Sequence, residues 1–253
     1  MANAEVYENF WTVRKYEKHR RVGLLSDEQA IFDRLAGELR SARLLDIGVG
    51  AGRTTGPLLQ RVKDYVGIDL SGGMVRACKR AFPSAELLEQ DARNLSRFLP
   101  GSFEAVSFSF NGIDYVSHDD RQRILSEIAR IVKPGGVLIF SSHNRDWVHA
   151  RDFRLPKMLV LNPVRAAFRA ARAVRCVFNR AINKPRERET PEYAMINDDE
   201  QSYGLLTYYI SLDEVKKQLV AAGFAGEILA YNRQGQTTTR NTEDPWVYYT
   251  ARK

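Results

Sequence analysis

The sequence predicts an α/β fold, in which a mostly parallel sheet carries helices on both of its faces. Three observations predict it: an apolar run at 44–47 leads into a glycine-rich turn, a second run ends in Asp69, and a third leads to Asp91. The first two runs and the segments after them follow the pattern of a strand, a turn and a helix. Further strands are expected at 103–110, up to residue 144, at 226–232 and at 246–251, the last two antiparallel.

Composition and length exclude several classes of protein. The 253 residues are 44% hydrophobic and 27% charged, as in ordinary globular chains. No apolar run approaches the roughly 20 residues that cross a bilayer, and the first residues lack the pattern of a secretory signal. Cys78 and Cys176 form no metal-binding or disulfide pattern. We therefore expect a cytoplasmic protein with reduced thiols and no metal site.

The glycine-rich turn is the strongest ligand-binding signal in the chain. Gly48, Gly50 and Gly52 alternate with small residues between a strand and a helix. Glycine allows a sharp turn and a close approach of the backbone to a ligand. A dinucleotide fingerprint would place its last glycine where Arg53 stands, which argues against a dinucleotide.

Acidic residues at the ends of the next two strands support a nucleoside ligand. Asp69 ends an apolar strand about twenty residues after the glycines, where an acid accepts hydrogen bonds from ribose hydroxyls. Asp91 ends the third strand and can accept a hydrogen bond from an adenine amine, while the Ala92 N–H faces a ring nitrogen. Leu70 and Met74 are further candidate contacts, and a core position remains the alternative for Met74.

These residues resemble class I S-adenosylmethionine-dependent methyltransferases of the small-molecule type. The resemblance implies a Rossmann-like, seven-stranded, mostly parallel sheet with an antiparallel C-terminal strand, and S-adenosylmethionine as the cofactor, with S-adenosylhomocysteine as its product. It also implies that Asp46 and the glycines line the methionine portion, Asp69 the ribose, and Asp91 with Ala92 the adenine. It covers about residues 40–143 and 211–252, and its motifs are Asp46–Gly52, Gly67–Asp69, Gln90–Ala92 and Lys133–Phe140.

Residues 1–25 are predicted to form an arm ahead of the domain. Aromatic and basic side chains are concentrated in this segment. They have two interpretations: the arm packs its aromatic side chains on the domain, or it closes over the cofactor. In the second interpretation Tyr16 and Arg20 or Arg21 reach the cofactor carboxylate.

The end of the fourth strand disfavours methylation of a nucleobase. Phe108 and Asn111 stand at the place that lies beside the reacting methyl group in the family, and both are candidate cofactor contacts. Amino-methylating DNA enzymes have an Asn/Asp-Pro-Pro-aromatic motif there, whereas this chain has Asn111–Asp114 without proline. The Pro-Cys nucleophile of cytosine C5 enzymes is also missing.

A hydroxyl acceptor requires a general base, and three residues are candidates. His143 ends the fifth strand, where an acceptor must approach, and histidine takes up protons near neutral pH. Tyr208 and His118 are the next candidates, and a strand expected at 203–210 would bring Tyr208 or Tyr209 to the acceptor. For His143 a hydrogen-bonded structural role is the alternative, and for His118 a helix cap.

Residues 145–210 interrupt the core domain (26–144 and 211–253) and are expected to form a helical and β cap over the acceptor. The cap begins with an amphipathic helix at 163–183, whose apolar side we expect to pack on the core. Residues 151–188 carry 11 basic and two acidic residues, which gives this segment a net charge of +9. The net charge of the whole chain is +7. Such a basic surface is also typical of contacts with anionic substrates, acidic lipids or RNA.

The sequence therefore supports three hypotheses. The first is a methyltransferase for a hydroxyl or amine of a small molecule, such as a sugar, a natural product or another metabolite, anionic or lipid-linked. The second is an RNA methyltransferase, for example of tRNA, that uses the helix at 163–183 as a tether. The third is a cofactor-binding regulator without activity. The acceptor, the methylated atom and the oligomeric state are left open.

Overall fold

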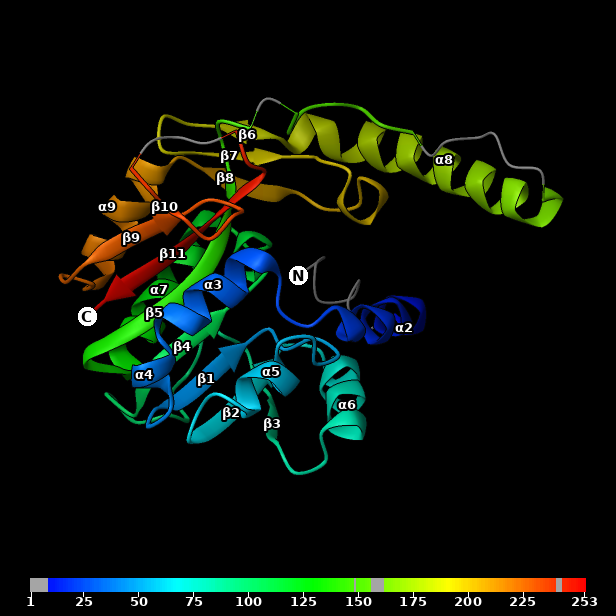
Figure 1. Cartoon of the computed structure of the whole chain (residues 1–253). Helices are drawn as coiled ribbons and strands as arrows, with labels where there is room; N and C mark the ends of the chain where they lie inside the picture. Colours follow the sequence, from blue (N-terminus) through cyan, green and yellow to red (C-terminus); the bar gives the residue numbers. More distant parts are fainter. Residues whose placement is uncertain (1–8, 148, 156–161, 240–242) are drawn as a thin grey trace.

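The glycine turn follows a central strand of an open sheet that has helices on both faces (Figure 1). The computed structural model describes residues 9–147, 149–155, 162–239 and 243–253. Seven of its strands run in the order β3-β2-β1-β4-β5-β11-β9, and β11 is antiparallel to both of its neighbours. This confirms the predicted sheet. The strands are β1 (Arg43–Ile47), β2 (Asp64–Asp69), β3 (Glu86–Glu89), β4 (Phe103–Phe108), β5 (Val132–Asn144), β9 (Ile228–Tyr231) and β11 (Trp246–Arg252).

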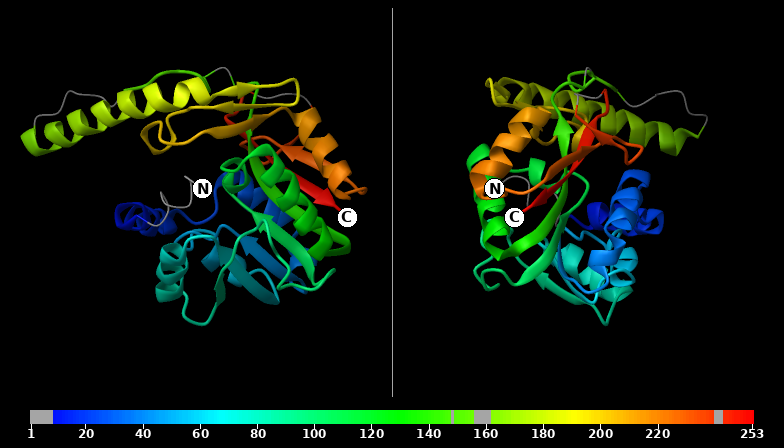
Figure 2. Two further views of the ribbon diagram at one scale, coloured as in Figure 1. Left: turned by 180° about the vertical axis from the view of Figure 1, so that it is seen from behind. Right: turned by 60° about the vertical axis from the view of Figure 1, so that its left-hand side comes forward.

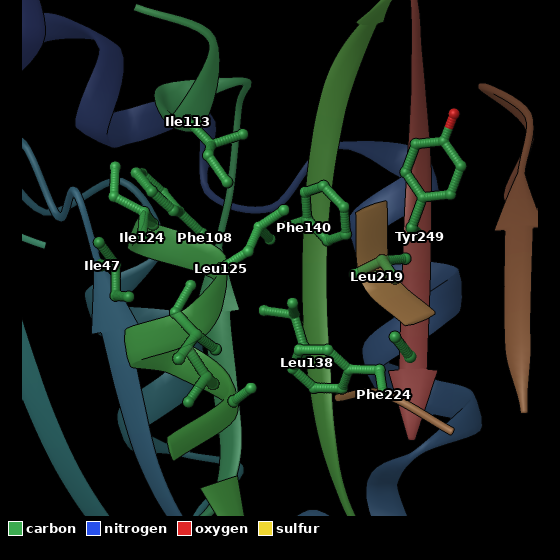
Figure 3. Packing of buried hydrophobic residues seen from close by; sticks show 14 of the residues in the cluster. Ile47, Phe108, Ile113, Ile124, Leu125, Leu138, Phe140, Leu219, Phe224 and Tyr249 are labelled. Atoms are coloured by element: carbon green, nitrogen blue, oxygen red, sulfur yellow. The ribbon is translucent and has the colours of Figure 1, made fainter. Parts of the chain in front are cut away.

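Helices cover both faces of the sheet. On one face, α7 (His118–Ile131) and α9 (Leu212–Ala222) pack on Ile47, Phe108 and Phe140 (Figure 3). The residues of β1 and β4 are almost all buried, as expected for central strands that are covered on two sides. The other face carries α3 (Ser26–Arg34), α4 (Ala36–Leu39), α5 (Thr55–Leu59) and α6 (Gly72–Ala81).

The N-terminal arm is helical where the structure describes it. Helix α2 (Phe10–His19) and the 3-10 turn η1 (Arg20–Val22) follow one another, and α2 lies against α6, where Arg80 donates a hydrogen bond to Glu17 at 2.9 Å. The ring of Tyr16 covers Gly50, where an added Cβ would stand 3.2 Å from it. Residues 1–8 of the predicted arm lie outside the described residues.

The insertion adds strands to the sheet that the sequence only partly predicts. Strands β6 (Arg188–Glu189), β7 (Tyr193–Ile196) and β8 (Thr207–Ile210) form an antiparallel meander, and β10 (Thr237–Thr238) pairs with β9. Strand β8 runs parallel to β5 at His143 and Asn144, beyond the last pairing of β4 with β5. The insertion therefore continues the sheet above the end of β4. Its 3-10 turns are η3 (Lys184–Arg186) and η4 (Glu200–Ser202), while η2 (Gly112–Asp114) follows β4.

Helix α8 (Pro163–Asn183) does not pack its apolar side on the core, so this expectation is wrong. The helix begins at Asn162, whose side chain accepts a hydrogen bond from the Arg165 N–H at 3.0 Å. It then extends away from the sheet (Figures 1 and 2), and Phe168 is 74% exposed. Within the described residues, no helix has the length and apolarity required to span a bilayer.

Candidate active site

The carboxyl ends of β1, β2, β4 and β5 meet at one edge of the sheet. The strand order reverses direction between β1 and β4, since β2 and β3 extend one side and β5 the other. Open α/β sheets bind their ligands at such a switch point. The glycine turn follows β1 and Asn111 follows β4, so both lie at this place.

The glycine turn has the backbone conformation that its sequence predicts. Gly48, Gly50 and Gly52 have φ values of 71°, 54° and 96°, in the left-handed region that side chains disfavour. At Gly52 an added Cβ would also stand 2.7 Å from the ring of Phe82. Phe108 lies against the first glycine, where its ring would be 3.1 Å from an added Cβ. The turn is thus held close to the elements that surround it.

Arg53 anchors this turn through a buried ion pair. Its guanidinium donates to both carboxylate oxygens of Glu28 at 2.6 and 2.7 Å, and Glu28 is fully buried. Glu28 also accepts hydrogen bonds from the Leu25 N–H and the Tyr248 hydroxyl at 2.7 and 2.5 Å. The residue that stands in place of a dinucleotide glycine therefore ties the turn to α3 and β11.

Asp46 lies beneath the turn and is almost completely buried. The hydroxyls of Thr54 and Tyr65 donate to its Oδ2 at 2.8 and 3.0 Å. Its Oδ1 has no hydrogen-bond partner among the described residues. Burial raises the pKa of Asp46 to about 6, even though these hydrogen bonds act in the opposite direction. A buried carboxylate with a free oxygen beneath a glycine turn suits a cationic donor such as the ammonium of a methionine group.

Asp69 connects the turns that follow β1 and β2. Its two carboxylate oxygens accept hydrogen bonds from the Gly50 and Ser71 N–H groups at 2.8 and 2.9 Å. A carboxylate has lone pairs for further donors, so these bonds are compatible with the predicted ribose contact. Leu70, the next residue, is 46% exposed, as a residue that touches a ligand would be.

The other residues predicted to contact the adenine already have partners within the protein. Asp91 accepts hydrogen bonds from the Arg93 guanidinium at 2.6 to 3.0 Å, and although partial burial acts to raise the pKa of Asp91, this pairing lowers it overall. Ala92 is half-buried against the core. Met74 is buried with Ala51 and Ala77, the core position that the sequence left as its alternative.

Arg21 and Tyr16 are separated by the structure. Tyr16 covers the glycine turn, whereas Arg21 is exposed and lines a surface depression together with Arg14, Glu17, Lys18 and Arg20. Burial raises the pKa of Cys78, which lies beside the turn, to about 11, and the charge of Arg20 acts against this rise. Arg20, which lines the same depression as Arg21, thus acts on Cys78 through its charge.

The segment after β4 has a strained backbone. Phe110 and Asn111 have φ values of 56° and 59°, and neither residue is glycine. Their N–H groups donate hydrogen bonds to the Tyr248 and Ser141 hydroxyls at 3.1 and 2.8 Å. Two buried hydroxyls thus hold a conformation that ends β4 two residues before the predicted strand end and turns Asn111 toward β5.

An aspartate that the sequence did not single out orients His143. Asp114 is fully buried, and its Oδ2 accepts hydrogen bonds from the His143 N–H and Nδ1 at 2.6 and 2.8 Å. The other ring nitrogen, Nε2, lies 3.3 Å from Asn111 Nδ2. With Nδ1 protonated toward Asp114, Nε2 carries the lone pair that can accept a proton. Burial acts to lower the pKa of His143, but the hydrogen bond and charge of Asp114 raise it overall.

The insertion places two further side chains beside His143. The Tyr209 ring lies 5.1 Å from the imidazole, centroid to centroid, and its hydroxyl donates to Asp198 at 3.0 Å. Asp198 is buried, and its negative charge adds to the effect of Asp114 on the pKa of His143. These contacts follow from the pairing of β8 with the end of β5.

Tyr208 and His118 lie on the opposite side of β8 and bond to each other. The Tyr208 hydroxyl is 2.8 Å from His118 Nδ1 and accepts a hydrogen bond from Gln218. Tyr208 is fully buried, and burial raises its pKa to about 12, which makes it a poor base near neutral pH. Tyr209, rather than Tyr208, therefore accompanies His143.

A chain of hydrogen bonds through a buried arginine joins the Tyr208–His118 pair to the Asp114–His143 pair. Arg121 donates to Gln218 at 3.0 Å and to Asp114 at 2.5 Å. Arg121 was not among the residues predicted from the sequence, although its position contained a signal. It lies three, four and seven residues before Ile124, Leu125 and Ile128, so it shares the buried side of α7. An arginine on an apolar helix side requires a buried acidic partner.

Comparison with known proteins identifies the domain. Residues 44–136 match the family model of the methyltransferase domain. The demethylmenaquinone methyltransferase of Renibacterium salmoninarum is 35% identical over 103 residues, which are 41% of this chain and 42% of the relative. The chain thus spans less than half the length of that relative.

The described residues hold no group of three His, Cys, Asp or Glu side chains arranged for a metal ion.

Solved structures extend the similarity of fold to most of the chain. A Thermotoga maritima S-adenosylmethionine-dependent methyltransferase, a possible histamine N-methyltransferase, is 21% identical with a TM-score of 0.58, covering 95% of this chain and 96% of the other. The Burkholderia thailandensis 1,6-didemethyltoxoflavin-N1-methyltransferase, bound to its substrate and S-adenosylhomocysteine, is 15% identical with a TM-score of 0.54 and coverage of 90% and 78%. Together with the domain match, these structures support S-adenosylmethionine as the cofactor.

Proposed function

We propose that this chain, whose residues 44–136 match a methyltransferase domain, methylates a small molecule with His143 as the general base. The observation that carries the proposal is the Asp114–His143 pair at the carboxyl end of β5. It lies one strand away from the end of β4, at the edge of the sheet where the glycine turn is also located.

Residues at the ends of two strands and on the N-terminal helix would hold the cofactor. The turn at Gly48–Gly52 and Asp46 would bind its methionine portion, and Asp69 its ribose. Leu70 would contact the nucleoside, and Tyr16 would close over the turn that it already covers. When bound, the cofactor supplies an electrophilic methyl group on a sulfonium, and transfer requires an in-line arrangement of acceptor, methyl and sulfur.

His143 would remove the proton that the acceptor loses on methylation. Asp114 holds Nδ1 and thereby presents Nε2 as the basic nitrogen, and it also stabilises the imidazolium that forms. The Asn111 amide, 3.3 Å from Nε2, fixes the ring plane. The buried surroundings of Tyr209 and Asp198 exclude water from one side of the imidazole.

The acceptor would be a small molecule with an ionisable O–H, N–H or activated C–H group. The Renibacterium relative is named for demethylmenaquinone, and the two solved structures for histamine and for a toxoflavin precursor. None of these three names refers to RNA, so the RNA alternative rests on the basic segment alone. A hydroxyl or amine acceptor, as the sequence suggested, uses the same base.

Transfer of label from S-adenosylmethionine tests the proposal. The full chain is incubated with methyl-labelled cofactor and, in parallel, with the small-molecule fraction and the RNA fraction of a bacterial extract, and the products are separated by chromatography. We expect a labelled small molecule with the wild type and a loss of about a hundredfold or more in its rate of formation with His143→Gln. The exposed His149→Gln serves as the matched control and should retain the wild-type rate. Label that appears only in RNA, or an unchanged rate with His143→Gln, would overturn the proposal.

A further inference from the structure

Helix α8 attaches to the rest of the insertion through its polar side. Asn179 and Asn183 donate hydrogen bonds from their amides to the Ser202 and Tyr203 carbonyl oxygens at 2.9 and 3.0 Å. Arg180 donates to the Asn197 carbonyl oxygen at 3.1 Å. The polar side of the helix therefore faces the protein.

The apolar side of α8 faces away from the protein. A helix of a globular protein normally buries its apolar side, so this orientation is the reverse of the usual one. The exposed apolar side chains recur at helical spacing along the whole helix and form a single stripe. They are Val164 (62% exposed), Phe168 (74%), Val174 (69%), Phe178 (63%) and Ile182 (49%), while Val177 (52%) is exposed outside this stripe.

The charge of the helix specifies what can cover this stripe. Residues 163–183 contain five arginines and no acidic residue. Arg165 and Arg172 are exposed beside the stripe and Arg175 is exposed within it, and the surrounding segment 151–188 has a net charge of +9. An apolar stripe beside a purely cationic margin is the pattern of a helix that lies in the interface of an anionic bilayer.

We propose that α8 lies flat in the surface of a membrane that contains anionic lipids. Its phenylalanine and aliphatic side chains insert between the acyl chains, and its arginines contact the lipid phosphates. Arginine suits this role because its planar guanidinium binds phosphate with two parallel hydrogen bonds. This surface is independent of the proposed catalytic role of His143.

Two other occupants fit the helix less well. In a dimer formed through the stripe, two helices with five arginines each would lie side by side, and neither contributes an acidic residue to offset the repulsion. RNA would neutralise the arginines but would leave the phenylalanine and valine side chains exposed to water. A bilayer satisfies both the apolar and the cationic parts.

Vesicle binding of the full chain tests this proposal. Co-sedimentation is measured with vesicles of phosphatidylcholine alone and with an equal mixture of phosphatidylcholine and phosphatidylglycerol. We expect binding to the mixture that weakens as salt is raised, and little binding to phosphatidylcholine alone. Phe168→Asp and Phe178→Asp should each lower the partition coefficient by roughly tenfold or more. Val220→Asp, which replaces an apolar side chain of α9 that is 60% exposed, is the matched control and should bind like the wild type.

Three results would overturn the proposal. One is equal binding of wild type and Phe168→Asp to the mixed vesicles, and another is no binding of the wild type. The third is a wild-type dimer in sedimentation velocity that Phe178→Asp converts to a monomer. Because both phenylalanines are exposed, their variants should unfold at the wild-type temperature, so that lost binding does not reflect misfolding.

Discussion

Removing Arg53 should destabilise the protein far more than removing an exposed arginine. Arg53→Met leaves the fully buried Glu28 carboxylate without its cationic partner. Removing one member of a buried pair costs about 3–5 kcal/mol, which lowers the unfolding temperature of a domain of this size by roughly 6–20 °C. The Leu25 and Tyr248 hydrogen bonds that remain on Glu28 do not replace a positive charge.

Thermal and urea unfolding of four variants, each against the wild type, measure this effect. Arg53→Met is compared with Glu28→Gln, with the double variant, and with Arg43→Met as the control. Arg43 pairs with Asp64, but the two side chains are 39% and 53% exposed, so its loss should cost about 1 kcal/mol or less. We expect the double variant to be more stable than the sum of the single losses predicts. Equal losses for Arg53→Met and Arg43→Met would refute the anchoring role of the pair.

Three further predictions follow from buried polar groups. The pKa of Asp46 is about 6 in the folded state against 3.8 for the unfolded chain, so its protonation stabilises the fold at low pH and this contribution is lost as pH rises toward 6. Asp46→Asn should therefore gain about 2 kcal/mol relative to wild type between pH 4 and pH 7 in urea unfolding, and parallel pH profiles would contradict the assignment. Because Asp114 raises the pKa of His143 in spite of burial, and the base must be neutral, the methylation rate should rise with pH through a midpoint above 6.5. Asp114→Asn should move that midpoint to lower pH, and an unmoved midpoint would exclude His143 as the titrating base. Tyr208→Phe removes a buried hydroxyl with two partners and should cost about 1–3 kcal/mol of stability while the rate stays within about twofold, whereas a large loss of rate would restore Tyr208 as a catalytic candidate.

Much of the core was predictable because it depends on local patterns. Strands buried on both faces are continuous apolar runs, and the turn after β1 requires glycine wherever φ is positive. Arg53 was visible as a departure from the dinucleotide pattern, but its partner Glu28 lies 25 residues away on α3. Sequence spacing gives no information on such a distant pair.

The catalytic pair and the orientation of α8 depend on tertiary contacts. Asp114 meets His143 only because two positive φ values end β4 early, and Tyr209 joins them because β8 pairs with β5 in one register. A shift of one residue in that register would have brought Tyr208 to His143 instead. The periodicity of 163–183 predicts an amphipathic helix, yet periodicity alone does not show which side faces the protein.

Calorimetric titration with S-adenosylhomocysteine tests the central claim most directly. We predict that the wild type binds this ligand and that Asp69→Ala binds it at least about tenfold more weakly, since the Asp69 carboxylate both holds the Gly50 N–H and would accept the ribose hydroxyls. Glu86→Ala, which removes an exposed carboxylate at the start of β3, should bind like the wild type. No binding by the wild type, or equal affinity for the wild type and Asp69→Ala, would contradict the account.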